Sequence, residues 1–173
     1  MDAKAVSEPT PMKNRTTVER TSERERVVTR TINGPARIVY EAWTKPELLK
    51  QWWVPKASGI SLLSCDLDAR VGGAYRLVFE FGGSQTMAFF GRYIDVVPLS
   101  RLVWTNEEDA DGGPVTTLTF EERGDKTLLV LRELYPSKEA LDAAIAQGIE
   151  MGVPELDQLD ALLVTLGASV RPS

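Results

Sequence analysis

The segment from residue 60 to residue 134 restricts the fold more than any other part of this sequence. Within it, runs that alternate apolar and polar residues are separated by short turns rich in glycine, such as those at 82–84 and 111–114. Alternation with a period of two is typical of β-strands that bury one face, and short glycine-rich turns join antiparallel neighbours. The pattern therefore predicts an antiparallel sheet, with a long strand over 85–97 that bends at Gly91.

Helical patterns flank this strand region. A strand-like stretch at 26–32 is followed by Pro35, which suits the first turn of a helix, and then by an apolar face from Ala36 to Trp43. A second short helix is expected to start near Pro46 and to end at residues 54–55. The order of these elements places two short helices directly after the first strand.

One apolar helical face near the C-terminus runs from Leu141 to Leu166, behind an expected N-cap at Ser137. Pro154 is expected to kink this helix or to split it near Gly152. The order of elements predicts an α+β fold, in which a sheet of six or seven antiparallel strands carries its helices on one face.

The ends of the chain are polar. Residues 1–23 carry many charged and hydroxyl side chains, and such a composition cannot bury enough apolar surface to order itself. The sequence therefore predicts a flexible tail at 1–23, a single domain at 24–168 and a short tail at 169–173. Either Met1 or Met12 could be the natural start.

Composition excludes several classes of function. The chain has no histidine and a single cysteine, Cys65, which rules out histidine-based catalytic relays, histidine-ligated metals and an internal disulfide. No metal or cofactor is therefore expected. The net charge of −5 argues against nucleic acid and anionic membranes as partners. Neither a membrane-spanning run nor a secretory signal is present, so a cytoplasmic location is expected.

Aromatic and methionine side chains form the main candidate site. The strand phase places several of them on one face of the sheet, where they could pack as ordinary core or form the wall of an apolar ligand cavity. Two glycines in the last helix, Gly148 and Gly152, are consistent with a gap or with close packing against the sheet. The candidate set is Trp53, Tyr75, Phe79, Phe81, Met87, Phe89, Tyr93, Trp104 and Met151.

Polar residues on the strands are the second candidate group. Arg76, Glu80, Arg132 and Glu133 could form exposed cross-strand ion pairs or could face the interior. Glu133 shares a strand face with two leucines, so it is the best interior candidate. A carboxylate beside an apolar wall could act as a general acid or base. Cys65 has no histidine to activate it and is expected to be an inert thiol.

Several segments, taken together, resemble the START-like or SRPBCC superfamily and, more narrowly, single-domain homologues of the activator of the heat-shock protein 90 ATPase. These segments are 35–44, 46–48, 52–55, 72–76, 91–93, 101–105, the glycines at 148 and 152, and 156–159. The resemblance covers about residues 25–167. It implies a helix-grip fold, in which a curved antiparallel sheet wraps a long C-terminal helix and leaves a cavity between them. This chain departs from the family at Val153 and Pro154, where a tryptophan often follows the second helix glycine.

Three functions follow as hypotheses. The first is binding of an apolar, lipid-like small molecule by Trp53, Tyr75, Phe79, Phe89, Tyr93, Trp104, Glu133, Gly148, Met151 and Gly152. The second is a cyclase- or hydrolase-type enzyme that uses Glu133 or Tyr75, although no catalytic constellation is evident and a binding protein is favoured. The third is stimulation of a chaperone ATPase, as the family name and a role in stress imply. An exposed edge strand could also pair two copies of the chain.

Overall fold

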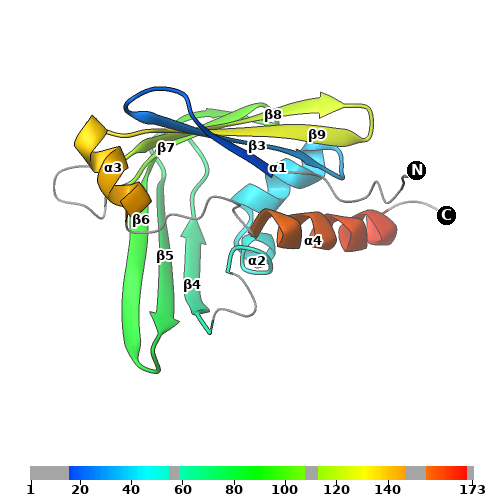
Figure 1. Ribbon diagram of the computed structural model, residues 1–173. Helices are drawn as coiled ribbons and strands as arrows, with labels where there is room; N and C mark the ends of the chain where they lie inside the picture. The colour runs from blue at the N-terminus through cyan, green and yellow to red at the C-terminus, as the bar shows by residue number, and fades with distance from the viewer. Residues whose placement is uncertain (1–15, 55–58, 108–112, 147–154, 171–173) are drawn as a thin grey trace, which may run out of the picture.

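The computed structural model in Figure 1 describes residues 16–54, 59–107, 113–146 and 155–170. An eight-stranded antiparallel sheet forms its body, in the order β2-β3-β9-β8-β7-β6-β5-β4. The strands are β2 (Thr16–Arg20), β3 (Glu25–Ile32), β4 (Ser61–Leu67), β5 (Ala74–Phe81), β6 (Gln85–Val97), β7 (Arg101–Thr105), β8 (Val115–Arg123) and β9 (Lys126–Leu134). The helices are α1 (Ala36–Thr44), α2 (Pro46–Leu49), α3 (Lys138–Ala146) and α4 (Glu155–Val170).

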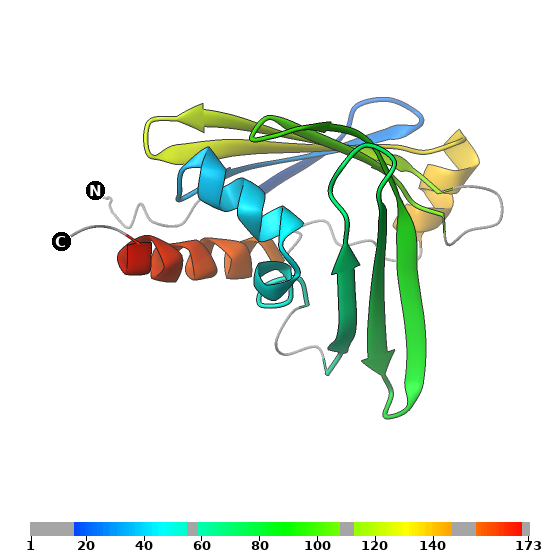
Figure 2. The same ribbon diagram turned by 180° about the vertical axis from the view of Figure 1, so that it is seen from behind.

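The helices cover only part of the sheet. Figures 1 and 2 show α1 and α4 packed below the portion formed by β3, β8 and β9, whereas β4, β5 and the tip of β6 extend away from them. The register shifts between Tyr93 and Asp95, where β6 passes from one portion of the sheet to the other. Gly91 lies just before this shift, and a Cβ there would stand 2.1 Å from the carbonyl oxygen of Thr105. The close approach of two strands explains the glycine at the predicted bend.

The core lies between the sheet and the helices, as the alternation in the sequence requires. Val28, Leu118 and Leu129 face inward from the sheet and are at most 3% exposed. Val39 of α1 and Leu159 of α4 meet them and are fully buried. Burying one apolar side chain of this size stabilises the folded state by roughly 1.5–3 kcal/mol. Apolar packing therefore holds both helices on this face.

A buried arginine fixes α4 to the sheet. Arg30, in the middle of β3, is 4% exposed and forms ion pairs with Asp157 and Asp160 of α4. Its Nη1 also donates to the Thr16 hydroxyl of β2 at 2.7 Å, and the backbone N–H of Asn33 donates to Asp160 at 2.8 Å. One cluster of charged and polar side chains therefore joins β2, β3 and α4.

The fold class is confirmed, but two details of the sequence prediction are wrong. The predicted tail at 1–23 contains β2, which pairs along its whole length with β3 through Thr16 and its neighbours. This additional strand raises the count from six or seven to eight. Strand pairing and the hydrogen bond to Arg30 order β2 without a long apolar run, and this explains why composition failed to reveal it.

The apolar face from Leu141 to Leu166 is divided between two helices, which is one of the two outcomes expected from Pro154. α3 ends at Ala146 and α4 begins at Glu155, and Figures 1 and 2 place the two helices at different ends of the sheet. The intervening sequence contains Pro154 and two glycines, which disfavour a helix interior. The expected break near Gly152 lies outside the described residues. The predicted cap is confirmed, because the Ser137 hydroxyl accepts from the N–H of Ala140 at 3.0 Å.

Substitution of Arg30 should reveal how strongly the charged cluster holds α4. We expect Arg30→Met to lower the free energy of unfolding by about 3–5 kcal/mol, because Asp160 would be left buried without its charge partner. Arg37→Met is the matched control, since Arg37 is exposed and 3.8 Å from Glu41, and it should cost less than about 0.5 kcal/mol. Urea unfolding followed by circular dichroism measures both. Equal midpoints for the two variants would contradict the role of Arg30.

Candidate functional site

The tryptophans of the chain gather around one cavity between the sheet and the helices, with a volume of about 280 Å³. All four line it: Trp43 comes from α1, Trp52 and Trp53 from the turn after α2, and Trp104 from β7. The ring of Trp43 lies 4.7 Å from that of Trp52, 5.8 Å from that of Trp53 and 6.0 Å from that of Trp104. These separations are typical of interacting aromatic pairs. The cavity therefore has an aromatic wall built around Trp43.

Local sequence explains how the two short helices build this wall. Trp43 lies on the buried face of α1, at the spacing that the helical period predicts. The indole N–H of Trp52 donates to the carbonyl oxygen of Ala42 at 3.0 Å, which ties the turn after α2 back to α1. On the other side, the Gln158 amide of α4 donates to the carbonyl oxygens of Trp52 and Val54, each at 2.9 Å. The tryptophan-bearing turn is thus fixed from both directions.

A single row of cross-strand partners forms the floor of the cavity. Arg26 of β3 pairs with Glu133 of β9, which pairs with Thr116 of β8, then Trp104 of β7 and Tyr93 of β6. Direct partners in an antiparallel sheet point to the same face, and all members of the row line the cavity. The floor therefore changes from charged at the β3 end to aromatic at the β6 end.

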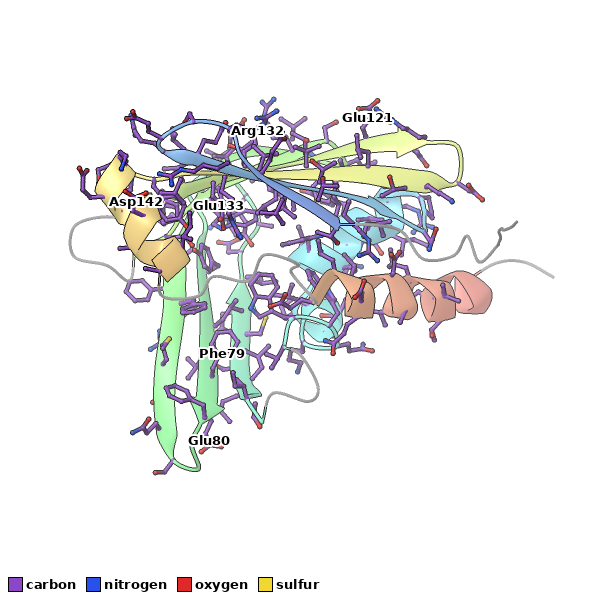
Figure 3. The ribbon with its side chains drawn as sticks, in the orientation of Figure 1. Phe79, Glu80, Glu121, Arg132, Glu133 and Asp142 are labelled. Atoms are coloured by element: carbon purple, nitrogen blue, oxygen red, sulfur yellow. The ribbon has the colours of Figure 1, made fainter. Side chains whose placement is uncertain are left out.

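The charged end of the floor is a buried ion pair. Nε and Nη2 of Arg26 both contact Oε1 of Glu133 at 2.9 Å, and the two side chains are 10% and 19% exposed. Figure 3 shows Glu133 below the sheet and Arg132 above it, as the strand alternation predicts. Burial, the Glu133 charge and a hydrogen bond to Glu133 raise the pKa of Tyr135 to about 12. The Tyr135 hydroxyl therefore remains protonated at neutral pH.

Two tyrosines, Tyr75 and Tyr93, line the cavity, and both keep their hydroxyl protons. The Tyr75 hydroxyl donates to the carbonyl oxygen of Thr105 at 2.6 Å. Burial raises the pKa of Tyr93 far above the usual range, so its hydroxyl does not ionise near neutral pH. Beside them, the Asn106 amide donates to the Thr116 hydroxyl at 3.1 Å. The polar groups on this side are thus held in a fixed network.

Six of the ten residues predicted for the site line the cavity: Trp53, Tyr75, Phe89, Tyr93, Trp104 and Glu133. Phe79 is buried but lies two residues beyond the lining residue Leu77 on β5. Its ring packs edge to face against that of Phe89, with the centroids 5.1 Å apart. Gly148, Met151 and Gly152 lie outside the described residues. Of the wider aromatic set, Phe81 is partly buried and Met87 is 46% exposed, and neither is part of the lining.

Sequence reasoning missed a larger part of the lining. Trp43, Leu49 and Trp52 line the cavity but are not among the predicted site residues. Leu77 lies two residues after Tyr75 on the same face of its strand, so the alternation could have predicted it as a lining residue. Leu131 shares the strand face of Glu133, so the alternation could have indicated it too. The remaining members depend on register or on the placement of α4, which the sequence pattern does not reveal: Arg26, Leu67, Leu102, Asn106, Thr116, Glu155 and Leu156.

The other polar candidates lie away from the cavity. Arg76 and Arg132 are exposed, and Glu80 is partly buried near the tip of β5. Burial raises the pKa of the half-buried Cys65 to about 11, so it remains a thiol at neutral pH. Within the described ranges, no group of carboxylate and cysteine side chains is arranged to hold a metal ion. No helix in the described part of the chain is long and apolar enough to cross a bilayer.

Solved structures of several bacterial proteins have the same fold. A protein from Rhodobacter sphaeroides is 24% identical, with a TM-score of 0.79 over 87% of this chain and 99% of its own. A protein from Chromobacterium violaceum is 30% identical, with a TM-score of 0.64 over 80% and 96%. An AHSA1-like protein from Aeromonas hydrophila is 18% identical, with a TM-score of 0.62 over 85% and 98%.

The sequence itself identifies the family. No curated protein matches the chain significantly. A family model, described as activator of Hsp90 ATPase homolog 1-like protein, matches residues 33–164, which include α1, β4 to β9 and most of α4. This match spans well over half of the chain and includes all four cavity tryptophans. The chain therefore belongs to the family of activator of Hsp90 ATPase homolog 1-like proteins and has their START-like fold.

Proposed function

We propose that this protein binds a small apolar ligand of one or two rings in the tryptophan-lined cavity. The observation that carries the proposal is the convergence of every tryptophan in the chain on one cavity. Tryptophan is the largest side chain and would fill a core efficiently if packing were its only role. Four of them around an open volume instead suit the recognition of a flat apolar molecule.

The volume sets the size of the ligand. An engineered apolar cavity of about 150 Å³ holds one benzene molecule. The cavity here, at about 280 Å³, has room for one ring with a substituent or for two fused rings. It lies just below the range for small-molecule sites, about 300–1,000 Å³. A long-chain lipid is therefore a poorer fit than a compact ring compound.

The cavity reaches the surface beside β6. Phe89 lines it and is also 37% exposed, so the lining is continuous with the outside at this residue. Trp53, another residue of the lining, is only partly buried. A ligand could enter beside Phe89 without unfolding the sheet.

Binding is better supported than acid–base catalysis. Glu133 is held by two guanidinium contacts from Arg26, and the Tyr75 hydroxyl is engaged by the Thr105 carbonyl oxygen. A general base must reach the proton of its substrate with an available lone pair, and a general acid must point its proton at the substrate. The Tyr75 hydroxyl would have to give up its hydrogen bond to donate a proton, and Oε1 of Glu133 is already occupied by both guanidinium contacts.

A cavity-filling substitution tests the proposal. We expect ring compounds such as tert-butylbenzene to quench or shift the tryptophan fluorescence of the natural protein in a saturable manner. Leu67 lines the cavity from β4, so Leu67→Phe should occupy part of the volume and weaken binding by at least about tenfold. Leu63→Phe, on the same strand but 53% exposed and outside the lining, should leave binding unchanged.

Equal loss of binding in both variants, or none in either, would place the ligand elsewhere. The absence of any saturable fluorescence change over a diverse set of ring compounds would contradict the proposal itself. That result would favour a protein partner, such as a chaperone, which could contact the exposed apolar side chains Ile94 and Val97 of β6 or Leu99 just after it.

A further inference from the structure

We propose that the ligand carries a neutral acceptor oxygen, such as the carbonyl oxygen of an aryl ketone, and that this oxygen receives a hydrogen bond from the Tyr93 hydroxyl. This inference rests on the proposed function, because it concerns the polar group of the molecule that the cavity holds. The observations behind it are the engaged polar groups of the lining and a buried hydroxyl that stands apart from them.

Tyr93 is a buried side chain whose hydroxyl lacks a partner. It lines the cavity from β6 and is only 4% exposed. Within the described part of the chain no group makes a hydrogen bond with this hydroxyl, and its pKa is raised mainly by burial. Buried hydroxyls in folded proteins are almost always hydrogen-bonded, and one that is not indicates a missing ligand or water. Tyr93 therefore marks a place where a ligand can supply the absent partner.

Other polar side chains of the lining already have partners. The Tyr75 hydroxyl donates to a backbone carbonyl oxygen at 2.6 Å, and the Asn106 amide donates to the Thr116 hydroxyl at 3.1 Å. Glu133 accepts two guanidinium contacts from Arg26. A ligand that bonds to any of these groups competes with an existing interaction. A ligand that bonds to Tyr93 breaks no hydrogen bond with a described residue.

The backbone holds Tyr93 in place before any ligand arrives. Its N–H donates to the carbonyl oxygen of Gly73 and its carbonyl oxygen accepts from the N–H of Gly72, both at 2.8 Å. The turn is tight enough to require glycine, since a Cβ on Gly73 would stand 1.9 Å from the carbonyl oxygen of Asp68. The ring of Tyr93 also packs against that of Tyr75, with the centroids 5.8 Å apart. A group that is ordered in advance loses less entropy on binding.

The chemistry of the hydroxyl selects the acceptor. Burial raises the pKa of Tyr93 far above its usual range, so the hydroxyl keeps its proton and can donate it in a hydrogen bond. One hydrogen bond can offset the burial of a neutral carbonyl oxygen, whereas a buried carboxylate loses far more hydration than one hydroxyl restores. A small ring compound with a ketone or similar oxygen therefore fits the cavity better than a free acid.

Two probes of the same shape isolate this hydrogen bond. Acetophenone and isopropenylbenzene differ only in that a carbonyl oxygen replaces a CH2 group, so isopropenylbenzene reports apolar packing alone. We expect Tyr93→Phe to lower the ratio of the acetophenone affinity to the isopropenylbenzene affinity about fivefold, as the loss of one neutral hydrogen bond requires. Titrations followed by nitrogen-15 NMR measure both affinities. The variant loses no hydrogen bond to a described residue, so its midpoint of urea unfolding should not fall.

Tyr75→Phe is the matched control. It also removes one hydroxyl from the lining, but that hydroxyl is already bonded to the carbonyl oxygen of Thr105. The ratio of the two affinities should therefore change less than about twofold. An unchanged ratio in Tyr93→Phe, as expected if the hydroxyl holds only a water, or an equal fall in both variants would overturn the assignment to Tyr93.

A second measurement uses the unmodified protein. The carbonyl carbon of carbon-13-labelled acetophenone resonates at higher frequency in water, where its oxygen accepts hydrogen bonds, than in cyclohexane. We expect the bound probe to resonate near the water value, because the Tyr93 hydroxyl replaces the lost water. A bound resonance near the cyclohexane value would overturn the inference without any variant.

The outcomes distinguish the two proposals. Binding of isopropenylbenzene without binding of acetophenone would overturn the inference about the acceptor oxygen and leave the small-molecule function standing. Failure of both probes to bind would contradict both proposals.

Discussion

The attachment of α4 to two separate parts of the fold is the constraint on which the cavity depends. Arg30 holds Asp157 and Asp160 against the sheet, and the Gln158 amide holds the turn that carries Trp52. These polar contacts alternate along the helix with the core leucines, so α4 is fixed in rotation as well as in position. Its first turn then supplies Glu155 and Leu156 to the cavity wall. Without this attachment the tryptophan cluster would lack one of its sides.

The sheet supplies the other half of the site through its register. One row of cross-strand partners carries a guanidinium, a carboxylate, a hydroxyl, an indole and a phenol in sequence from β3 to β6. The row runs across the strands, so neighbouring functional groups come from distant parts of the chain. This graded floor, below an aromatic wall, would give the proposed ligand an apolar surface to pack against.

The sequence could predict what local pattern controls. Alternation placed Tyr75, Phe89 and Tyr93 on the inner face, and glycine turns located the hairpins. Pairing between distant strands has no local signature, so Arg26 and Thr116 escaped notice although both sit beside predicted site residues. The split between α3 and α4 was foreseen as an option at Pro154, but the periodicity of apolar residues continued across it and suggested one helix. Tertiary contacts, not helix period, decide where those leucines pack.

The most direct test of the account follows the indole N–H signals of the four tryptophans by nitrogen-15 NMR. Because each tryptophan lines the same cavity, a single ligand must change the surroundings of all of them. During a titration with tert-butylbenzene, the account predicts that every indole signal shifts with one common dissociation constant. Indole signals that stay fixed at saturating probe, or that move with unrelated constants, would contradict a shared binding site in this cavity.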